Sequence, residues 1–469
     1  MPAVPERLRA LLAPEAPLQQ LAQLFVDAGR EVYLVGGSVR DALIGVDQHD
    51  VDLTTNARPD EIQSLVAPWA EQVWLQGKTF GTVGCSRGDM QVEVTTFRAE
   101  VYRPDSRKPI VSFSDDITTD LSRRDFTVNA MALRLPDMEL IDPYGGTADL
   151  AAKRLRTPME PKVAFEDDPL RMLRAARFMT ALSLEPEPEL VRAVEQMANR
   201  LEIVSAERIR DELSRLIVLP DPSIGLWFYV RTGLAAQFLP ELPGLMLEQD
   251  PIHRHKDVLA HTIAVVAKTR PDLRVRLAAL LHDVGKPRTR SFDSGAVTFH
   301  HHEVVGARMA KTRMRELHYP NDVTDDVVQL VYLHLRFHTY RMGWTDKAVR
   351  RYVRDAGPLL DDLNQLVRCD CTTRNQAKAR ELSRRMDELE WRITELRAQE
   401  ELDAIRPLLD GNQVMVFLGV NPGRVVGEAL EMLLDVRLDE GPLGEEEAYK
   451  RLESWARERD ITPTGNRPT

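Results

Sequence analysis

The stretch Tyr33–Thr54, YLVGGSVRDALIGVDQHDVDLT, decides the fold expected for this chain. It begins with an apolar segment typical of a short buried strand and then turns at Gly36 and Gly37. Paired glycines let the backbone turn sharply and present N–H groups to an anion. Ser38 adds a hydroxyl at the expected start of a helix, where amide dipoles favour phosphate. The stretch therefore predicts a strand–turn–helix unit that binds phosphate.

The same stretch carries two carboxylates close to its end, in Asp50-Val51-Asp52. Residues two apart on a strand face the same side, so both carboxylates should point one way while Val51 and Leu53 point into the core. Magnesium binds one or two carboxylates together with substrate phosphates. A lone D-x-D pattern is more often a solvated strand edge, but the Gly-Gly turn upstream favours the metal-binding interpretation.

Further strands are expected after this unit, at 73–75, 82–86 and 90–96. The last of them alternates, with Val92 and Val94 expected inward and Glu93 outward. Glu93 is a candidate third carboxylate if its strand neighbours the D-x-D strand. The alternative is an ordinary exposed glutamate on a strand.

A polar segment, 101–117, is expected to be a surface loop because it contains Pro104, Asp105 and several charged residues. The next segment, DLSRRDFTVNAMALRL, places Arg124, Asp125 and Asn129 close together beside an apolar strand. Guanidinium groups suit bidentate phosphate contacts. A surface ion-pair network is the other interpretation of this cluster.

From about residue 154 the pattern becomes helical. In FEDDPLRMLRAARFM, Asp167 and Asp168 precede Arg171 by four and three residues, which predicts that they share a helix face. Cytosine and adenine both present an amino donor beside a ring-nitrogen acceptor, and a carboxylate with an arginine can recognise that pattern. Such a pair would admit CTP and ATP and exclude UTP and GTP, although an isolated pair is more often a stabilising salt bridge. A second charged helix, Glu207–Leu213, is expected to line the same cleft.

Most of the eleven histidines fall between His253 and His338. Imidazoles and carboxylates spaced along helices form metal sites with positions open to a phosphoryl substrate. A single histidine would more often be a core or surface residue, but the adjacent pair His282-Asp283 and the density of histidines favour a metal site.

Composition sets the limits of these interpretations. The chain has 469 residues, enough for about three domains, a formal net charge of −11, 43% hydrophobic residues and three cysteines. These values suit a globular protein of a reducing cytosol, and we expect a cytoplasmic location. No apolar run is long enough to span a membrane, and the N-terminus lacks a signal-peptide pattern. The negative charge disfavours broad nucleic-acid affinity without excluding a local basic stripe.

Ordered motifs carry a resemblance to a known family. LVGGSVRDALIG, HDVDLTT, DLSRRDFTVNAMA, DPYGGTADLAAKRLRTP, DDPLRMLRAARF and ERIRDEL occur in the order seen in class II tRNA nucleotidyltransferases, the bacterial CCA-adding enzymes and their poly(A) polymerase relatives. HTIAVV, LLHDVGKP, HHHEVVGA and RCDCTTRN resemble an HD phosphohydrolase domain. The resemblance covers roughly residues 30 to 375 and is weaker in the tail.

The resemblance implies an α+β fold. We expect a nucleotidyltransferase head with a small mixed β-sheet (1–153), a helical neck that selects the nucleotide (154–250), an all-α HD domain (251–375) and a helical tail that contacts tRNA (376–469), with its last residues disordered. It implies catalytic roles for Asp50, Asp52 and Glu93, the first two binding Mg²⁺. It implies nucleotide-binding roles for twelve residues: Gly36, Gly37, Arg40, Asp41, Arg124, Asp125, Asn129, Asp167, Asp168, Arg171, Arg174 and Arg208. We expect Ser38 to contact the nucleotide as well.

In the HD part the resemblance implies the metal ligands His261, His282, Asp283 and Asp370, and His302 is our choice among three consecutive histidines. The metal there would be a divalent transition metal or Mg²⁺. The implied activity is addition of CCA to the 3′ end of tRNA from CTP and ATP, with no membrane partner. The alternatives are CC-adding, A-adding or poly(A) addition, an HD-type phosphatase or 2′,3′-cyclic phosphodiesterase, and a non-catalytic RNA-binding protein. The sequence does not specify an oligomeric state.

Overall fold

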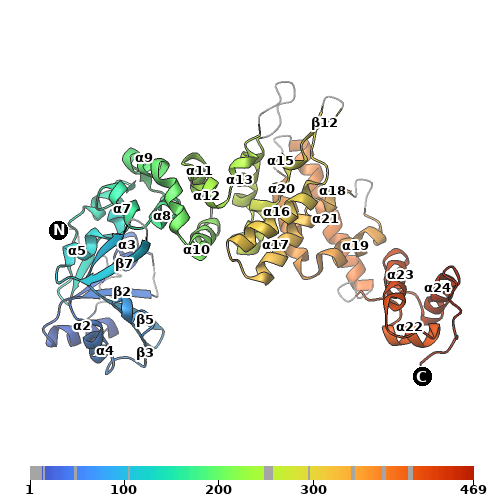
Figure 1. The fold of residues 1–469 in the computed structure, drawn as a ribbon, viewed down its shortest axis with the longest axis horizontal. Helices are drawn as coiled ribbons and strands as arrows, with labels where there is room; N and C mark the ends of the chain where they lie inside the picture. Colours follow the sequence, from blue (N-terminus) through green and yellow to red (C-terminus); the bar gives the residue numbers. More distant parts are fainter. Residues whose placement is uncertain are drawn as a thin grey trace. The chain divides into compact units, whose positions relative to one another are not determined.

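The computed structural model of the protein describes residues 13, 16–46, 50–103, 106–247, 257–293, 296–339, 344–371, 376–399 and 405–468. The chain divides into two compact units, Met1–Pro243 and Gly244–Thr469. The first contains the described seven-stranded sheet and the second is mainly helical (Figure 1). This arrangement confirms the predicted α+β fold. The expectation that residues 251–375 are all-α is wrong, because β12 (Ser291–Asp293) and β13 (Ala296–Thr298) pair as an antiparallel hairpin there.

The sheet of the first unit has the strand order β3-β4-β5-β2-β1-β8-β9. Its strands are β1 (Val32–Val35), β2 (Asp50–Thr55), β3 (Gln72–Trp74), β4 (Thr82–Arg87), β5 (Met90–Thr96), β8 (Ala132–Leu135) and β9 (Glu139–Ile141). β2 runs parallel to β5, and the other neighbouring pairs are antiparallel. The sheet is therefore mixed, as predicted, and places the D-x-D strand beside the strand of Glu93.

Both faces of β1 are buried because its four residues are all apolar or aromatic. Val32 and Leu34 pack into one cluster with residues of α2 (Pro17–Asp27) and α4 (Pro59–Val66), while Tyr33 and Val35 pack into a second cluster on the other face. Alternating side chains on a strand point to opposite faces. β1 is thus a central strand packed on both faces, and this packing holds the start of the Gly-Gly turn in place.

One predicted loop is wrong. The segment expected to be a polar surface loop forms the antiparallel hairpin β6 (Arg98–Arg103) and β7 (Ser106–Phe113), while Pro104 and Asp105 lie outside the described residues. Polar composition concealed these strands because each satisfies its backbone hydrogen bonds through the other strand of the hairpin. Local composition does not reveal such a partner.

The remaining elements of the first unit are helical. Short helices accompany the sheet in the head (16–153): α3 (Gly37–Ile44), α5 (Ile117–Ser122) and α6 (Gly146–Ala151). The neck (161–238) consists of α7 (Pro161–Asp167), α8 (Leu170–Ala181), α9 (Pro188–Met197), α10 (Ala206–Ile217), α11 (Ser223–Arg231) and α12 (Leu234–Phe238). Helix α8 packs against α10 and α11, so it forms the centre of the neck.

The second unit begins with a helical region that carries the histidines. Its helices are α13 (Val258–Lys268), α14 (Leu273–Leu281), α15 (Lys286–Thr289), α16 (His302–Glu316), α17 (Asn321–Leu333), α18 (Arg336–Thr339), α19 (Asp346–Ala356), α20 (Leu360–Asp370) and α21 (Gln376–Gln399). Helix α14 contacts α13, α17 and α20. This central helix ends where His282 and Asp283 follow, which places both residues in the interior.

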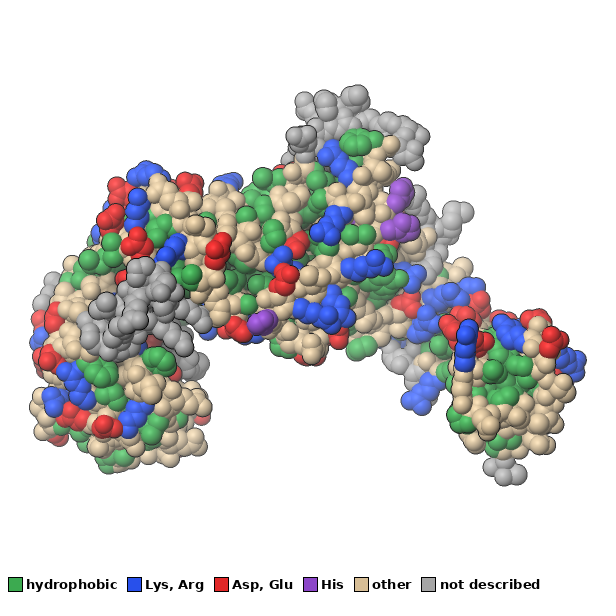
Figure 2. Space-filling model, viewed as in Figure 1, with side chains coloured by type: hydrophobic (Ala, Val, Ile, Leu, Met, Phe, Trp, Pro, Cys, Tyr) green, Lys and Arg blue, Asp and Glu red, His purple; other side chains and the backbone are tan. Residues whose placement is uncertain are grey.

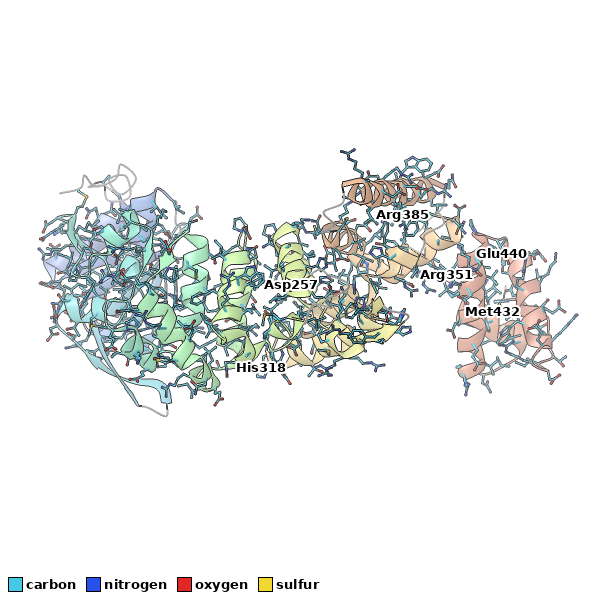
Figure 3. All side chains as sticks on the ribbon, turned by 90° about the horizontal axis from the view of Figure 1, so that it is seen from above. Asp257, His318, Arg351, Arg385, Met432 and Glu440 are labelled. Atoms are coloured by element: carbon cyan, nitrogen blue, oxygen red, sulfur yellow. The ribbon has the colours of Figure 1, made fainter. Side chains whose placement is uncertain are left out.

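A helical bundle, the tail, closes the second unit: α22 (Gly411–Leu418), α23 (Arg424–Glu440) and α24 (Glu445–Arg457). Arg351 of α19 lies beside α23 (Figure 3) and donates to Asp439 at 3.0 Å. The expectation of disorder at the end of the chain is wrong for residues 462–468. The Thr464 amide and hydroxyl donate to the Phe417 carbonyl at 2.9 and 3.0 Å, because the end of α22 offers an unpaired carbonyl there.

Among the described residues, no helix is long and apolar enough to cross a membrane. Acidic and basic side chains are intermingled on the face of each unit that is visible in Figure 2. The tail residues 405–468 contain more acidic than basic side chains. The net charge of these residues therefore offers no support for the prediction that the tail contacts tRNA.

Candidate functional site

Asp52 and Glu93 occupy paired positions on one face of the head sheet. They are Cα partners in the parallel ladder of β2 and β5, and both side chains are exposed, while Val51 and Leu53 are buried as the alternation predicts. Neighbouring strands lie about 5 Å apart, so two such carboxylates can ligate one cation. Asp50 belongs to the same strand, but its side chain lies outside the described residues.

The Gly-Gly turn leads directly to this carboxylate pair. Gly36 has φ of +67° and ψ of −131°, and helix α3 begins at the next residue. The Ser38 hydroxyl accepts a hydrogen bond from the Asp52 amide at 3.3 Å. Because of this contact, the amide-rich start of α3 lies beside Asp52. The predicted phosphate-binding turn and the predicted metal-binding strand are therefore neighbours in space.

The guanidinium of Arg124 covers the turn. A Cβ atom on Gly36 would lie 2.8 Å from Arg124 Nη1, so a larger residue there would displace this guanidinium. Arg124 Nη2 donates to Asp120 at 3.3 Å, whereas its Nε is buried and has no hydrogen-bond partner among the residues that the structure describes. A buried guanidinium donor without an acceptor fits an anionic ligand at this turn.

A chain of hydrogen bonds connects the turn with the neck. Arg40 holds Asp41 through two hydrogen bonds of 2.7 and 2.9 Å and donates a third to Asn129. Asn129 donates to Asp125 Oδ1 at 2.9 Å, and Arg174 of α8 donates to Asp125 Oδ2. Residues from three separate predicted motifs thus form one network.

The network continues into α10 through Glu212, which is buried. Arg177 donates to Glu212 at 2.7 Å, and Arg174 reaches the same carboxylate at 3.4 Å. Burial alone would raise the pKa of Asp125, but the charge of Arg174 and hydrogen bonds from Asn129 and Arg174 lower it to about 2. The carboxylate is therefore ionised at neutral pH and rigidly held.

The prediction that Asp167, Asp168 and Arg171 share one helix face is wrong. Asp167 ends α7, Asp168 is extended with φ of −140° and ψ of 101°, and α8 begins only at Leu170. The cause is Pro169, because the residue before a proline is disfavoured in the helical conformation. Sequence spacing alone implied a continuous helix that the proline interrupts.

Asp168 nevertheless contacts two helices of the neck, α8 and α10. Its Oδ1 accepts from the Leu170 amide at 3.1 Å, and its Oδ2 accepts from Arg208 of α10 at 2.7 Å. Arg171 is buried and donates to the carbonyls of Ala164 and Arg123, so it also joins neck to head. These contacts distinguish Asp168 from Asp167, which the sequence alone did not.

The second candidate site is a cluster of histidines and aspartates in the second unit. All five predicted ligands come together there, namely His261, His282, Asp283, His302 and Asp370. His261 Nε2 lies 2.9 Å from Asp370 Oδ1 and 3.5 Å from Asp283 Oδ2. The choice among the consecutive histidines agrees with this geometry, since His302 is buried whereas the His301 side chain is 84% exposed.

A sixth residue, His334, belongs to this cluster and is absent from the predicted ligands. It follows the end of α17, is 1% exposed, and its Nε2 lies 3.3 Å from His302 Nε2. It sits in the apolar run LVYLHLRF, where a core histidine is the more common interpretation. The feature of the sequence that could have identified His334 is its position near the end of an apolar helix within the histidine-rich region.

The electrostatics of the cluster favour a bound cation. Burial lowers the pKa of His282, but Asp283 and Asp370 outweigh burial and raise it to about 10. Burial, together with the charge of His282, lowers the pKa of His334 to about 3. Lys286 Nζ already pairs with Asp283 Oδ2 at 2.6 Å, and the remaining imidazole and carboxylate donors fit a divalent metal ion.

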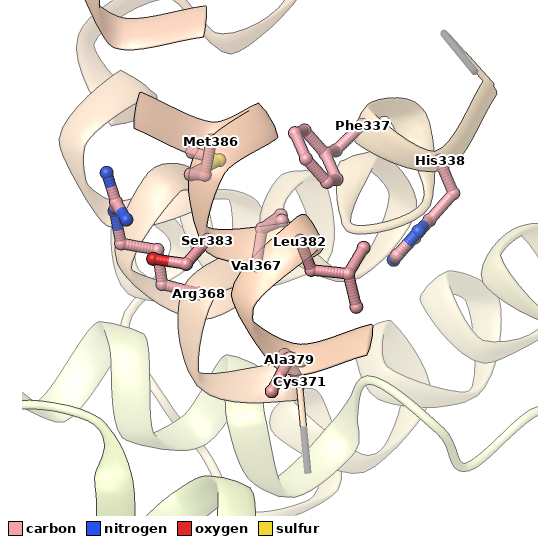
Figure 4. Close-up of a pocket in the computed structure, with 9 residues that line it drawn as sticks. All are labelled: Phe337, His338, Val367, Arg368, Cys371, Ala379, Leu382, Ser383 and Met386. Carbon is pink, nitrogen blue, oxygen red and sulfur yellow. The ribbon is translucent and has the colours of Figure 1, made fainter. Parts of the chain in front are cut away.

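A separate pocket of about 160 Å³ lies between helices α18, α20 and α21 (Figure 4). Its lining includes the apolar side chains Phe337, Val367 and Met386 and the polar side chains His338 and Arg368. None of the clustered histidines and aspartates is among its described lining residues. The pocket is therefore not the metal cluster itself.

Three family models match the regions that contain the two candidate sites. Residues 32–156 match the family model of the poly A polymerase head domain, and residues 183–245 match the probable RNA and SrmB-binding site of polymerase A. Residues 258–375 match the HD domain. The carboxylate pair thus lies in the head match and the histidine cluster in the HD match.

One similar protein extends this comparison over nine-tenths of the chain. An A-adding tRNA nucleotidyltransferase of Deinococcus radiodurans is 37% identical over 91% of this chain and 95% of its own length. A CCA-adding enzyme of Levilactobacillus brevis is 39% identical, but over 47% of this chain and 54% of its own length. The solved CCA-adding enzyme of Bacillus stearothermophilus in complex with CTP shares the fold, with a TM-score of 0.69, 24% identity and coverage of 96% of this chain and 99% of that one.

Proposed function

The chain belongs to the family of tRNA nucleotidyltransferases, enzymes that add nucleotides to the 3′ end of tRNA, and we propose that it builds the terminal CCA sequence from CTP and ATP. The single observation that supports this most directly is the exposed pair Asp52 and Glu93 beside the Gly36–Ser38 turn. An oxygen-only ligand set next to an amide-rich turn suits a magnesium-bound triphosphate.

In this proposal the two carboxylates, together with Asp50, hold the metal. Bound magnesium would lower the pKa of the tRNA 3′-hydroxyl and neutralise the leaving pyrophosphate. The start of α3 and the guanidinium of Arg124, whose Nη1 lies beside Gly36, donate hydrogen bonds to the phosphates. The 3′-oxygen attacks the α-phosphate, the new P–O bond forms, and the bond to pyrophosphate breaks.

Base choice is proposed to depend on Asp168. Its carboxylate accepts from the amino group that cytosine and adenine both present beside a ring-nitrogen acceptor. Arg208 holds the carboxylate in place at 2.7 Å. Uracil and guanine present the opposite pattern of donors and acceptors and are rejected.

Addition of the terminal A alone is the second candidate. The specific observation that favours it is the relative from Deinococcus radiodurans, an A-adding enzyme similar to this chain over nearly its whole length. The carboxylate pair and turn serve both activities equally, because the chemical step is the same.

One experiment tests both candidates. Transcripts of tRNA ending before CCA, after C and after CC are incubated with CTP and ATP, separately and together, and product lengths are read on a sequencing gel. Extension of the first transcript by three nucleotides supports CCA addition. Extension only of the transcript ending in CC, and only with ATP, overturns it in favour of A addition. No extension of any transcript overturns both.

A further inference from the structure

A tryptophan lies in the same row of the head sheet as the carboxylate pair. The row crosses four neighbouring strands and consists of Asp52 in β2, Glu93 in β5, Gly84 in β4 and Trp74 in β3. Paired residues on neighbouring strands face the same side of a sheet. The indole therefore stands on the face that carries the carboxylates, two strands away from Glu93 (Figure 1).

The indole occupies the space that a side chain at position 84 would fill. A Cβ atom on Gly84 would lie 1.9 Å from Trp74 Nε1, 2.1 Å from its Cε2 and 2.6 Å from its Cζ2. Glycine in the interior of a strand weakens the strand and often marks the close approach of another group. Here that group is the indole, which extends from the edge strand β3 inward, in the direction of Glu93.

An aromatic side chain that covers a strand glycine can serve stability alone. Trp74, however, remains partly exposed. Its indole N–H has no hydrogen-bond partner among the residues that the structure describes. Trp74 can therefore offer both an aromatic surface and a donor to a ligand on this face of the sheet.

The face that carries the carboxylates is covered on one side of Asp52 and open on the other. On the side of β1, Tyr33 and Val35 of this face pack into a buried cluster. On the side of β5, β4 and β3, Gln91 is exposed and Trp74 is partly exposed. A polynucleotide can therefore approach the carboxylate pair along the row that leads to Trp74.

The proposed chemistry gives the two sides of the carboxylate pair different occupants. The Gly36–Ser38 turn follows β1, so the triphosphate and its leaving pyrophosphate lie on the β1 side of Asp52. In phosphoryl transfer the attacking and leaving oxygens are roughly in line with the reacting phosphorus. The acceptor hydroxyl must then arrive from the opposite side, which is the side of Trp74.

We propose that Trp74 is a positioning residue for the acceptor: its indole stacks on the base of the last nucleotide of tRNA and directs the 3′-hydroxyl towards the carboxylate pair. This inference rests on the function proposed above, whose other contacts concern the incoming nucleotide. Aromatic side chains bind unpaired RNA bases by stacking. Stacking tolerates any base, because every base has a π-face, and this suits an acceptor whose last nucleotide changes with each addition.

Substitutions in the row test the proposal by extension of a tRNA transcript that the wild type extends. Trp74→Ala should raise the KM for tRNA at least fivefold, the factor that corresponds to about 1 kcal/mol of stacking, and leave the KM for ATP within twofold. Gly84→Ala should act in the same way, because its Cβ displaces the indole. Trp74→Phe keeps a π-face and should retain most of the affinity, whereas Trp74→Leu only covers Gly84 and should not.

Val73→Ala is the matched control, because Val73 is an exposed neighbour in the same strand and faces the other side of the sheet. It should leave both KM values unchanged. An unchanged KM for tRNA in Trp74→Ala, or an equal rise of both KM values, would overturn the proposal. Full affinity in Trp74→Leu would also overturn it, since cover of the glycine would then be sufficient.

An acceptor that lacks its terminal base separates stacking from a structural role. Fluorescence anisotropy measures the dissociation constants of transcripts with and without the base of the last nucleotide. Base removal should weaken binding to the wild type as much as Trp74→Ala does, and should weaken binding to Trp74→Ala no further. Equal effects of base removal on both proteins would overturn the proposal. Trp74→Leu replaces Trp74→Ala in this comparison if circular dichroism shows that the alanine variant does not fold.

The result also distinguishes this inference from the function on which it rests. A wild type that extends no transcript would refute the proposed function and the role of Trp74 with it. A wild type that extends tRNA, together with unchanged KM values in the variants, would refute the role of Trp74 alone.

Discussion

Arg174 donates two hydrogen bonds to a single carboxylate oxygen of Asp125, from Nε at 2.8 Å and from Nη2 at 2.6 Å. Asp125 belongs to the head and Arg174 to the first long helix of the neck. Through Asn129 the same carboxylate reaches Arg40, next to the Gly36–Gly37 turn. The pair therefore fixes the neck helix relative to the turn.

Removal of this arginine should destabilise the first unit. Arg174→Ala leaves Asp125 buried without its cation, and breaking a buried ion pair in this way costs about 3 kcal/mol. Chemical denaturation followed by circular dichroism measures the change. Arg192→Ala, which removes an exposed arginine of α9 with a 3.7 Å partner, is the control and should change stability by less than about 0.5 kcal/mol. Equal effects of the two changes would contradict a special role for Arg174.

The free energy of unfolding should decrease at acidic pH because Asp125 becomes protonated. Its pKa is lowered to about 2 in the folded protein, from an ordinary value near 3.8. Its contribution is therefore complete above the unfolded-state pKa and is lost as pH falls from about 4 to 2, to the extent of about 2 kcal/mol. The difference in melting temperature between the wild type and Asp125→Asn should be constant from pH 5 to 7 and shrink below pH 4. A difference that grows on acidification would contradict the sign.

Two glycines with positive φ should respond differently to alanine. Gly45→Ala adds a Cβ with no atom within 4 Å, so only the left-handed backbone opposes it, at about 1 kcal/mol. Gly36→Ala is destabilised by the same left-handed backbone, and its Cβ also displaces the Arg124 guanidinium, whose Nη1 would lie 2.8 Å away. We expect Gly36→Ala to raise the KM for ATP more than tenfold and Gly45→Ala to leave it within twofold. Similar KM values would remove Arg124 and the turn from the phosphate site.

Loss of one carboxylate should stop the chemistry without unfolding the head. Asp52 is exposed, so Asp52→Asn should leave the melting temperature unchanged and lower kcat for AMP incorporation at least a thousandfold, because the amide no longer carries the charge that binds magnesium. Asp89→Asn, in the exposed turn between β4 and β5, is the control. Incorporation by Asp52→Asn at the rate of the control would refute the assignment.

The two adjacent aspartates of the neck should differ in nucleotide selection. Asp168 contacts Arg208 and the start of α8, whereas Asp167 ends the preceding helix. We expect Asp168→Ala to reduce the preference for ATP over GTP by at least tenfold in kcat/KM, since the acceptor for the amino group is lost. Asp167→Ala should change that preference less than twofold. The reverse result would assign base recognition to Asp167.

Local features of the molecule could be read from the sequence because short-range stereochemistry controls them. The alternation that buries Val51 and Leu53 and exposes Asp52 follows from strand geometry, and the glycine turn follows from φ values that only glycine adopts easily. The break at Pro169 was also readable by the same kind of rule, although helical spacing concealed it. The backbone conformation of each of these residues depends mainly on its immediate neighbours in the chain.

Long-range packing decided the rest. Asp52 and Glu93 are 41 positions apart, and only the strand order places them side by side. The strands β6 and β7 form because each supplies the hydrogen-bond partner of the other, which polar composition does not encode. His334 joins His302 because α17 packs against α16 and α14, whereas its own surroundings in the sequence are those of a core residue. The sequence by itself thus determined the candidate residues and those local features that neighbouring residues control, such as the alternation of β2 and the glycine turn. The tertiary structure alone decided which of them meet, because hydrophobic burial and strand pairing bring together groups whose separation along the chain carries no information about their distance in space.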